Sequence, residues 1–213
     1  MTSIWLRFLE ILACISFASS GVLTAAKMKM DLFGVIVLGV VTTVGGGLIR
    51  DIILGVRPPV MFCDYTYVTT SVITSLILFI IIYFKKELLT DARRVHYDTL
   101  MLIFDSIGLA IFTVVGVNTA IRLGYSDNVL LVTFVGVITG IGGGITRDVL
   151  TGNIPYIFVK HIYALASVAG AVICYYSYNV LGAELSMTLA SIIIVLIRFA
   201  AAYFKWNMPH ISE

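Results

Sequence analysis

Two arginine–aspartate pairs, each following a run of three glycines, are the side chains of this sequence best suited to handle ions. Arg50 and Asp51 follow the first run, and Arg147 and Asp148 follow the second. Both pairs lie in strongly apolar segments, where a charged side chain costs about 2.5–3.5 kcal/mol on membrane-insertion scales. Such charges are typical of an ion or substrate path, where they contact water or an opposite charge. The glycines are Gly45, Gly46, Gly47, Gly142, Gly143 and Gly144.

These motifs belong to a longer internal repeat. The stretches Gly39–Gly55 and Gly136–Gly152 are 97 residues apart and identical at nine of seventeen positions. The correspondence extends beyond them, since Glu10 aligns with Asp105. The chain therefore consists largely of two related units.

The composition is that of an integral membrane protein. Of the 213 residues, 60% are hydrophobic and 12% are charged, and the mean hydropathy is +1.04. Soluble domains carry about 25% charged residues. The net charge of +2 does not indicate a nucleic-acid partner. The three widely spaced cysteines and the lack of nucleotide, metal or nucleophile motifs indicate neither a metal, a cofactor nor an enzyme.

Seven apolar segments approach the 20 residues that a helix needs to cross a bilayer. Because they are continuous rather than alternating, we predict an all-α membrane protein with seven transmembrane helices and not a β-barrel. Two three-helix repeats take up residues 1–96 and 97–180, and a seventh helix with a short tail takes up residues 181–213. The predicted spans are residues 4–26, 31–56, 65–84, 97–122, 128–152, 156–179 and 182–205.

The second repeat is expected to be inverted relative to the first, because three spans is an odd number. Inverted repeats with glycine-interrupted spans point to a transport path near the bilayer midplane. Positive charges favour the cytoplasmic side, which places the N-terminus outside and the C-terminus in the cytoplasm of a cell inner (plasma) membrane. The cytoplasmic set is Lys27, Lys29, Lys85, Lys86, Arg93, Arg94, Lys160 and Lys205, and the outer set is Arg7, Arg57 and Arg122.

The glycine runs predict weak points in two helices. Each glycine lowers helix stability by about 1 kcal/mol relative to alanine, so the chain could bend there and leave carbonyl oxygens open to a partner. The alternative is that the glycines only permit close helix packing.

Several pairings of the arginines are open. Neighbouring residues on a helix do not face each other, so Arg50 is not expected to pair with Asp51. Pairing across the repeats would join Arg50 to Asp148 and Arg147 to Asp51, whereas Glu10 or Asp105 could also supply the carboxylate. Both arginines could instead lie near the interfaces and extend toward water.

Other polar residues give weaker signals. Glu10, Asp105, Ser16 and Asn118 could line a wet path. The two carboxylates could instead lie at the interface, and serine often bonds its own helix backbone. The tyrosines fit aromatic belts at the two membrane surfaces; they are Tyr65, Tyr67, Tyr83, Tyr156 and Tyr203.

The doubled Gly-Gly-Gly-x-x-Arg-Asp motif, followed in each copy by Gly-x-x-Pro, resembles a known family over about residues 5–205. It is similar to the prokaryotic trimeric intracellular cation (TRIC) channels, bacterial membrane proteins with a doubled glycine-transporter-type domain. The resemblance implies a homotrimer with a pore in each protomer that passes potassium or sodium ions between helices two and five. The six motif glycines would then be the bends, and the Arg-Asp pairs would belong to the pore. The lysine motif by which animal members bind a phosphoinositide is not present.

The function that we expect is a potassium-permeable channel. A secondary transporter of a small zwitterion such as glycine is the alternative, and a purely structural membrane subunit is a third. Two arginines in a pore should repel cations, so either nearby carboxylates neutralise them or backbone carbonyls set the selectivity.

Overall fold

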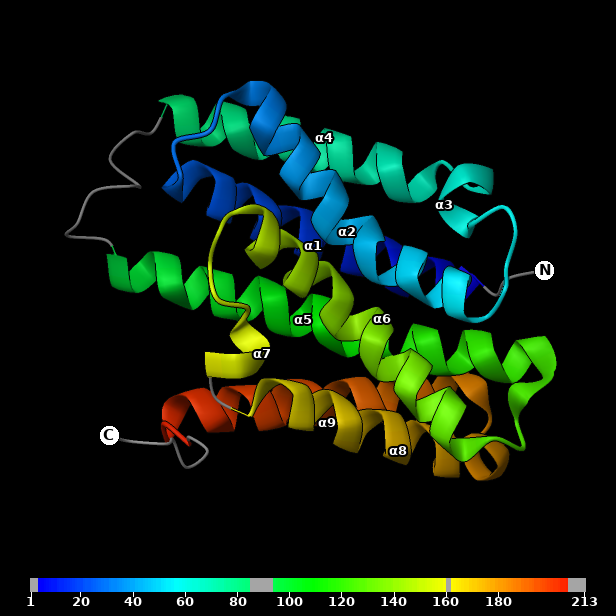
Figure 1. Cartoon of the computed structure of the whole chain (residues 1–213). Helices are drawn as coiled ribbons and strands as arrows, with labels where there is room; N and C mark the ends of the chain where they lie inside the picture. Colours follow the sequence, from blue (N-terminus) through cyan, green and yellow to red (C-terminus); the bar gives the residue numbers. More distant parts are fainter. Residues whose placement is uncertain (1–3, 85–93, 160–161, 207–213) are drawn as a thin grey trace.

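The computed structural model describes residues 4–84, 94–159 and 162–206. Every regular element in these ranges is a helix, and Figure 1 shows how they are arranged. The elements are α1 (Ile4–Lys27), α2 (Leu32–Ile53), α3 (Val60–Cys63), α4 (Thr66–Phe84), α5 (Arg94–Ala120), the π-helical turn η3 (Ile121–Tyr125), α6 (Val129–Leu150), α7 (Tyr156–Val159), α8 (Tyr163–Leu181) and α9 (Ala183–Tyr203).

Seven of the described helices are long and apolar enough to span a membrane, which confirms the predicted fold class. The sixth span begins at Tyr163 rather than at residue 156. The reason is that Tyr156–Val159 forms a separate short helix after Pro155. Lys85, Lys86, Arg93, Lys160 and His161 lie outside the described residues, so the orientation drawn from the charge bias stays a prediction.

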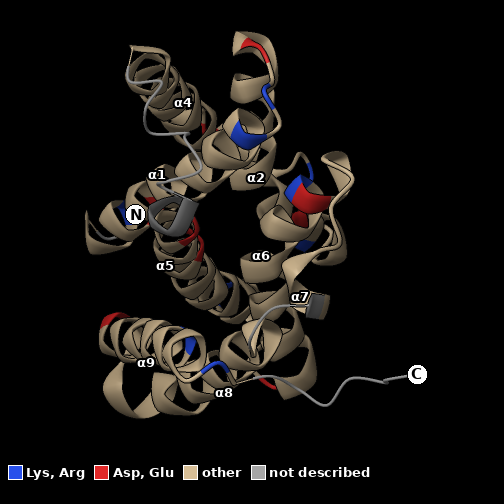
Figure 2. Ribbon diagram, turned by 90° about the vertical axis from the view of Figure 1, so that its left-hand side faces the viewer, with Lys and Arg blue, Asp and Glu red and all other residues tan. Residues whose placement is uncertain are grey.

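The two three-helix units run in opposite directions. In Figure 1 α1 runs from right to left and α5 from left to right, and the two termini lie at opposite ends of the bundle. Figure 2, viewed along the helices, shows α1, α2 and α4 on one side, α8 and α9 on the other, and α5 and α6 between them. The core helices α2 and α6 therefore each belong to one repeat and pack against each other.

The repeat is reproduced in the ends of its central helices. Asp31 caps α2 by accepting the Gly34 N–H at 2.8 Å, and Asn128 caps α6 by accepting the Leu131 N–H at 3.0 Å. Both helices end at a left-handed glycine, Gly55 with φ 70° and Gly152 with φ 68°. This C-terminal geometry needs a positive φ, which glycine adopts without a steric penalty.

The glycine runs do not unwind the helices, contrary to one expectation from the sequence. Helix α2 continues through Gly45–Gly47 and α6 through Gly142–Gly144, so their carbonyl oxygens stay in the helical pattern. The second glycine of each run lies at a crossing instead. A Cβ on Gly46 would collide with the Thr139 carbonyl, and one on Gly143 with the Thr42 carbonyl. Close packing therefore accounts for Gly46 and Gly143, and the bends expected at the glycine runs stay a prediction.

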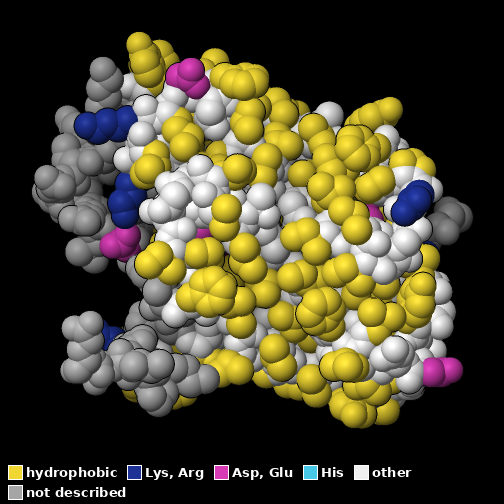
Figure 3. Space-filling model, viewed as in Figure 1, with side chains coloured by type: hydrophobic (Ala, Val, Ile, Leu, Met, Phe, Trp, Pro, Cys, Tyr) yellow, Lys and Arg dark blue, Asp and Glu magenta, His cyan; other side chains and the backbone are white. Residues whose placement is uncertain are grey.

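The outer surface matches a lipid environment. On the face shown in Figure 3, hydrophobic side chains cover the middle, and most exposed charged side chains lie toward the two ends. Tyr65, Tyr83 and Tyr203 are exposed, as expected for aromatic belts. Tyr67 and Tyr156 are partly buried instead, and both contact the functional groups described below.

Candidate functional site

A polar cavity of about 300 Å³ enters the bundle at the end where α1 begins. Its mouth is formed by two exposed residues of η3, Arg122 and Leu123. Deeper in, Glu10 and Arg50 contribute buried charges. The remaining lining residues are Leu6, Arg7, Val60, Asp64, Tyr67, Val115, Asn118 and Thr119.

A smaller cavity lies next to this one, against the second half of α2. It measures about 20 Å³ and shares Arg50 and Tyr67 with the larger cavity. Its inner wall includes Gly47 and Phe112. The Phe112 ring lies 5.2 Å from that of Phe17, its counterpart in the first repeat. These two aromatic rings close the centre of the bundle.

Arg50 pairs with the residue next to it, so the expectation that it would not is wrong. Its Nε donates to Asp51 Oδ1 at 2.8 Å, and its Nη2 lies 2.8 Å from the same oxygen. The second oxygen, Asp51 Oδ2, accepts the Val60 N–H at 2.8 Å. The loop after α2 thus holds the carboxylate in place, and the long arginine side chain folds back over it. We call Glu10, Arg50, Asp51 and Tyr67 the open cluster.

Arg147 repeats this geometry in the second unit. Its Nε donates to Asp148 Oδ1 at 2.8 Å, and Asp148 Oδ2 accepts the Tyr156 N–H at 3.0 Å. Its Nη1 also bonds Asp105 Oδ1 at 2.8 Å and donates to Ser20. No cross-pairing between the two motifs is present among the described ion pairs, whereas the alternative partner Asp105 is confirmed.

The second cluster is dry. The side chains of Arg147 and Asp105 have no exposed surface, and that of Asp148 is 3% exposed. The Tyr156 ring lies 5.4 Å from the guanidinium carbon of Arg147, and the Tyr163 ring lies 4.6 Å from that of Arg198. We call Asp105, Arg147, Asp148 and Tyr163 the sealed cluster; none of the four lines the 300 Å³ or the 20 Å³ cavity.

The third glycine of each run has a different task from the second. A Cβ on Gly47 would lie 3.7 Å from Arg50 Nη2, and one on Gly144 would lie 3.8 Å from Arg147 Nη2. The spacing of three residues places each glycine on the same helix face as its arginine. These glycines therefore lie beside the guanidinium groups rather than at the helix crossing.

The weaker candidates separate into three groups. Glu10 and Asn118 line the cavity, and Asn118 Oδ1 accepts the Tyr178 hydroxyl at 2.8 Å. Asp105 belongs to the sealed cluster. Ser16 donates to the Leu12 carbonyl at 2.8 Å and is not a cavity-lining residue, so the backbone-bonding alternative applies to it.

The sequence reasoning missed Tyr67 and Asp64. Tyr67 was assigned to an aromatic belt, but it lies between the two cavities, and Tyr163 is its counterpart 96 residues later. This match between the two repeats is the feature of the sequence that could have identified Tyr67 as a site residue. Asp64 pairs with Arg7 at the cavity wall. Burial raises the pKa of Asp64, but hydrogen bonds from Thr66 and Arg7 outweigh burial, and the net pKa is lowered.

The described residues contain no group of three or more His, Cys, Asp or Glu side chains placed to hold a metal ion. The carboxylates of the site instead make ion pairs with arginines.

Comparison with known sequences finds a family model described as glycine transporter, matched twice, over residues 7–83 and 102–179. The inner membrane protein YadS of Escherichia coli K12 is 38% identical over 205 residues, which cover 95% of this chain and 94% of YadS. The membrane protein YvgT of Bacillus subtilis is 31% identical over 206 residues, or 97% and 96% of the two chains.

Solved structures of similar fold are also found. A prokaryotic TRIC channel crystallised in 0.5 M KCl is 32% identical and superposes with a TM-score of 0.84, covering 95% of this chain and 98% of that one. The TRIC trimeric intracellular cation channel orthologue from Rhodobacter sphaeroides is 28% identical, with a TM-score of 0.83 over 96% and 100% of the two chains.

Proposed function

This chain belongs to the TRIC family, in the group of prokaryotic members with a doubled glycine-transporter domain, and we propose that it is a potassium-permeable cation channel of the inner membrane. Its structural relatives are cation channels and not enzymes. The proposed ion path lies within one protomer, between α2 and α6. The observation that carries the proposal is the charged cavity of about 300 Å³, which enters one end of the bundle and is lined by the buried Arg50 of α2.

Apart from the exposed Arg122 at the mouth, the arginines that line the cavity have carboxylate partners, which supports a path for cations. Arg50 is neutralised by Asp51, and Arg7 by Asp64 and Glu10. An unpaired arginine would repel a cation, but an arginine held by a carboxylate presents little net charge. Glu10 lies within ion-pair distance of Arg7, at 3.7 Å, and its carboxylate also bonds the Tyr67 hydroxyl. Because its arginine contact is longer than those of Asp51 and Asp64, we take Glu10 as the carboxylate that an ion in this cavity would contact.

Conduction requires a change from the conformation described here. Gly46 and Gly143 leave no space between α2 and α6 where the two helices cross. In the second repeat, the buried Arg147–Asp105 pair of the sealed cluster would also block an ion. Opening would separate the helices near Gly46 and Gly143 and admit water to Arg147. The glycine runs would serve this step because each one lowers helix stability locally.

The chain is proposed to assemble as a homotrimer in contact with membrane lipids, as the description of the Rhodobacter sphaeroides relative indicates for that protein. Cross-linking in native membranes tests this, because a ladder that ends at three copies supports the assembly and one that ends at two refutes it. The N-terminus outside and the C-terminus inside remain part of the proposal. Cysteine accessibility at the two termini tests that orientation.

A secondary transporter of a small zwitterion is the second candidate. It is favoured by the contrast between one open and one sealed cluster, which is what one state of an alternating-access carrier would contain. The carboxylate of such a substrate could bind one of the cavity arginines.

Planar-bilayer recording of the purified protein separates the two candidates. Unitary potassium currents that do not depend on glycine support the channel. Saturable glycine uptake into liposomes without any unitary current would refute it. Replacing potassium by sodium in the same recordings measures how selective the path is.

A further inference from the structure

An apolar cavity of about 550 Å³ lies at the opposite end of the first repeat from the charged cavity. It is bounded by the end of α1, the start of α2 and the end of α4. Its volume falls within the usual range of ligand pockets. Among the residues that the structure describes, Lys29 is the one charged residue of the lining; the others are Val22, Ala26, Met30, Val35, Phe79, Ile82 and Tyr83.

At the corresponding place in the second repeat, two tyrosines make hydrogen bonds to neighbouring residues. Tyr175 donates its hydroxyl to the Ser126 carbonyl at 2.7 Å, and Tyr178 donates to Asn118 at 2.8 Å. Their counterparts 96 residues earlier, Phe79 and Ile82, have no hydroxyl to make these bonds. The two repeats therefore differ here, and the first repeat keeps the space open.

The residue that ends α1 also differs from its counterpart in the second repeat. Lys29 has a left-handed φ of 55°, and the Met30 N–H bonds the Ala25 carbonyl at 3.0 Å to end α1. The repeat-related position is Gly124, with φ 90°. A side chain makes the left-handed conformation costly, whereas glycine adopts it freely. The first repeat thus keeps a lysine where glycine would relieve backbone strain.

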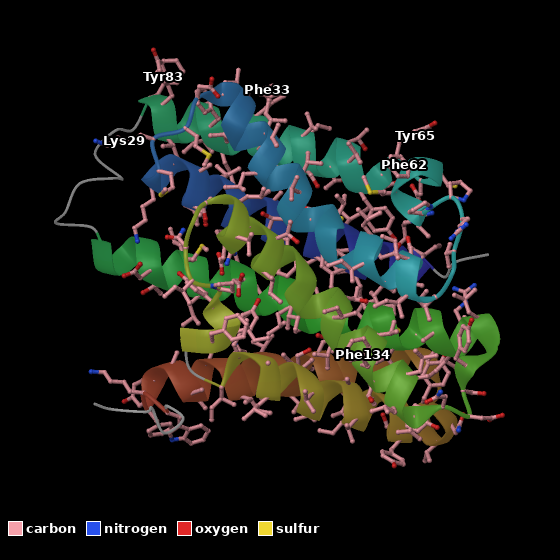
Figure 4. The ribbon with its side chains drawn as sticks, in the orientation of Figure 1. Lys29, Phe33, Phe62, Tyr65, Tyr83 and Phe134 are labelled. Carbon is pink, nitrogen blue, oxygen red and sulfur yellow. The ribbon has the colours of Figure 1, made fainter. Side chains whose placement is uncertain are left out.

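We propose that this cavity binds one acyl chain of an anionic phospholipid, whose phosphate contacts the Lys29 ammonium group. Figure 4 shows Lys29, Phe33 and Tyr83 at the same end of the bundle. Aromatic and basic side chains at the end of a membrane-spanning bundle are suited to the lipid headgroup region. The apolar cavity next to them is suited to the acyl chain. The nearby carboxylate Asp31 already accepts the Gly34 N–H as the cap of α2.

The occupant is a phospholipid rather than a free anion because the cavity walls are apolar. We take the headgroup to be anionic because Lys29 lines the cavity and would gain little from a zwitterionic headgroup. This end of the bundle is the one that the charge bias assigns to the cytoplasm, where anionic lipids are enriched. The site is separate from the proposed ion path, so the two can fail independently.

Native mass spectrometry of the delipidated full-length protein tests the site with added phosphatidylglycerol and phosphatidylcholine. We expect phosphatidylglycerol to bind more tightly, and Lys29→Gln to weaken it by about fivefold, the worth of one lysine near an anionic lipid. Ala26→Phe fills the cavity and should weaken both lipids. Lys29→Gly should bind as poorly as Lys29→Gln while unfolding at the same or a higher temperature, which excludes misfolding.

Lys205→Gln is the matched control. Lys205 is also left-handed, with φ 52°, but it does not line the cavity, so lipid binding should be unchanged. Equal binding of both lipids to the wild type, or equal phosphatidylglycerol binding to the wild type, Lys29→Gly and Ala26→Phe, would overturn the proposal. Displacement of phosphatidylglycerol by inorganic phosphate alone would also overturn the proposal, because the acyl chain of the lipid would then contribute nothing to binding.

Discussion

The open and the sealed cluster are built from the same repeated motif but differ in their access to water. In both, an arginine bonds the next aspartate, and that aspartate accepts a loop N–H. Arg50 faces a cavity of about 300 Å³, whereas the side chain of Arg147 has no exposed surface. The motif therefore determines the local pairing but not the hydration.

The difference follows from the residues around each arginine. Ser20 and Asp105 both bond Arg147 and close the space in front of it. The position that aligns with Ser20 is Val115, which cannot bond an arginine and lines the open cavity instead. Glu10 lies within ion-pair distance of Arg7. Ser20 against Val115, and Asp105 against Glu10, are thus two differences between the repeats that lie at the two arginines and accompany their different access to water.

The largest effect is expected from Arg147→Ala. The change leaves Asp105 and Asp148 buried without their cation, which costs about 3–5 kcal/mol for a buried pair. Thermal unfolding in detergent, followed by circular dichroism, measures it. Arg50→Ala is the matched variant, and it should cost less because water in the cavity can solvate Asp51. Equal losses would contradict the contrast between the clusters, and Arg147→Lys gives a milder test if the alanine variant does not fold.

The next effect concerns the helix crossing. Gly46→Ala and Gly143→Ala should each destabilise the protein by about 1–3 kcal/mol, the usual cost of overpacking, because the new methyl group meets a carbonyl of the other helix. Gly47→Ala is the control, since its methyl group would lie 3.7 Å from a flexible arginine. Unfolding temperatures of the three variants rank them. A Gly47 variant as unstable as the Gly46 variant would disprove the assignment of the crossing.

A smaller effect is expected from Glu10→Gln. Removing this charge should lower potassium conductance by about fivefold, because a unit charge about 4 Å from an ion in water is worth about 1 kcal/mol. Single-channel recording at low salt measures it. Ser16→Ala should leave conductance unchanged, since Ser16 bonds its own helix backbone. If both variants lower the potassium conductance, or if neither does, the assignment of Glu10 to the ion path is wrong.

The smallest effect is a pH dependence of the Arg7–Asp64 pair at the cavity wall. Because the pKa of Asp64 is lowered on folding, its contribution is present above the unfolded pKa of about 3.9 and is lost as the pH falls through the folded pKa. The pair is partly exposed and worth at most about 1 kcal/mol. Unfolding temperatures should therefore be flat from pH 7 to about pH 5 and fall slightly more below that in the wild type than in Arg7→Gln. A parallel fall in both proteins would count against this pair.

The sequence predicted the fold better than the site. The seven spans, their division into two inverted units and the added last helix follow from apolar segment lengths and from a repeat visible by identity. The start of the sixth span was wrong because Tyr156–Val159 is apolar like a span but ends after one turn. Apolarity alone does not distinguish a short helix at the interface from the first turn of a long one.

What the sequence alone determined is the set of parts: two glycine runs, two Arg-Asp pairs and the carboxylates Glu10 and Asp105. The tertiary structure decided how they are used. It placed Gly46 and Gly143 at the helix crossing. It also turned each arginine onto its own neighbour, because the following loop fixes the aspartate. The sequence could not decide which cluster is wet, since that depends on residues distant in the chain, such as Ser20 and Val115, that reach the arginines only in the folded bundle.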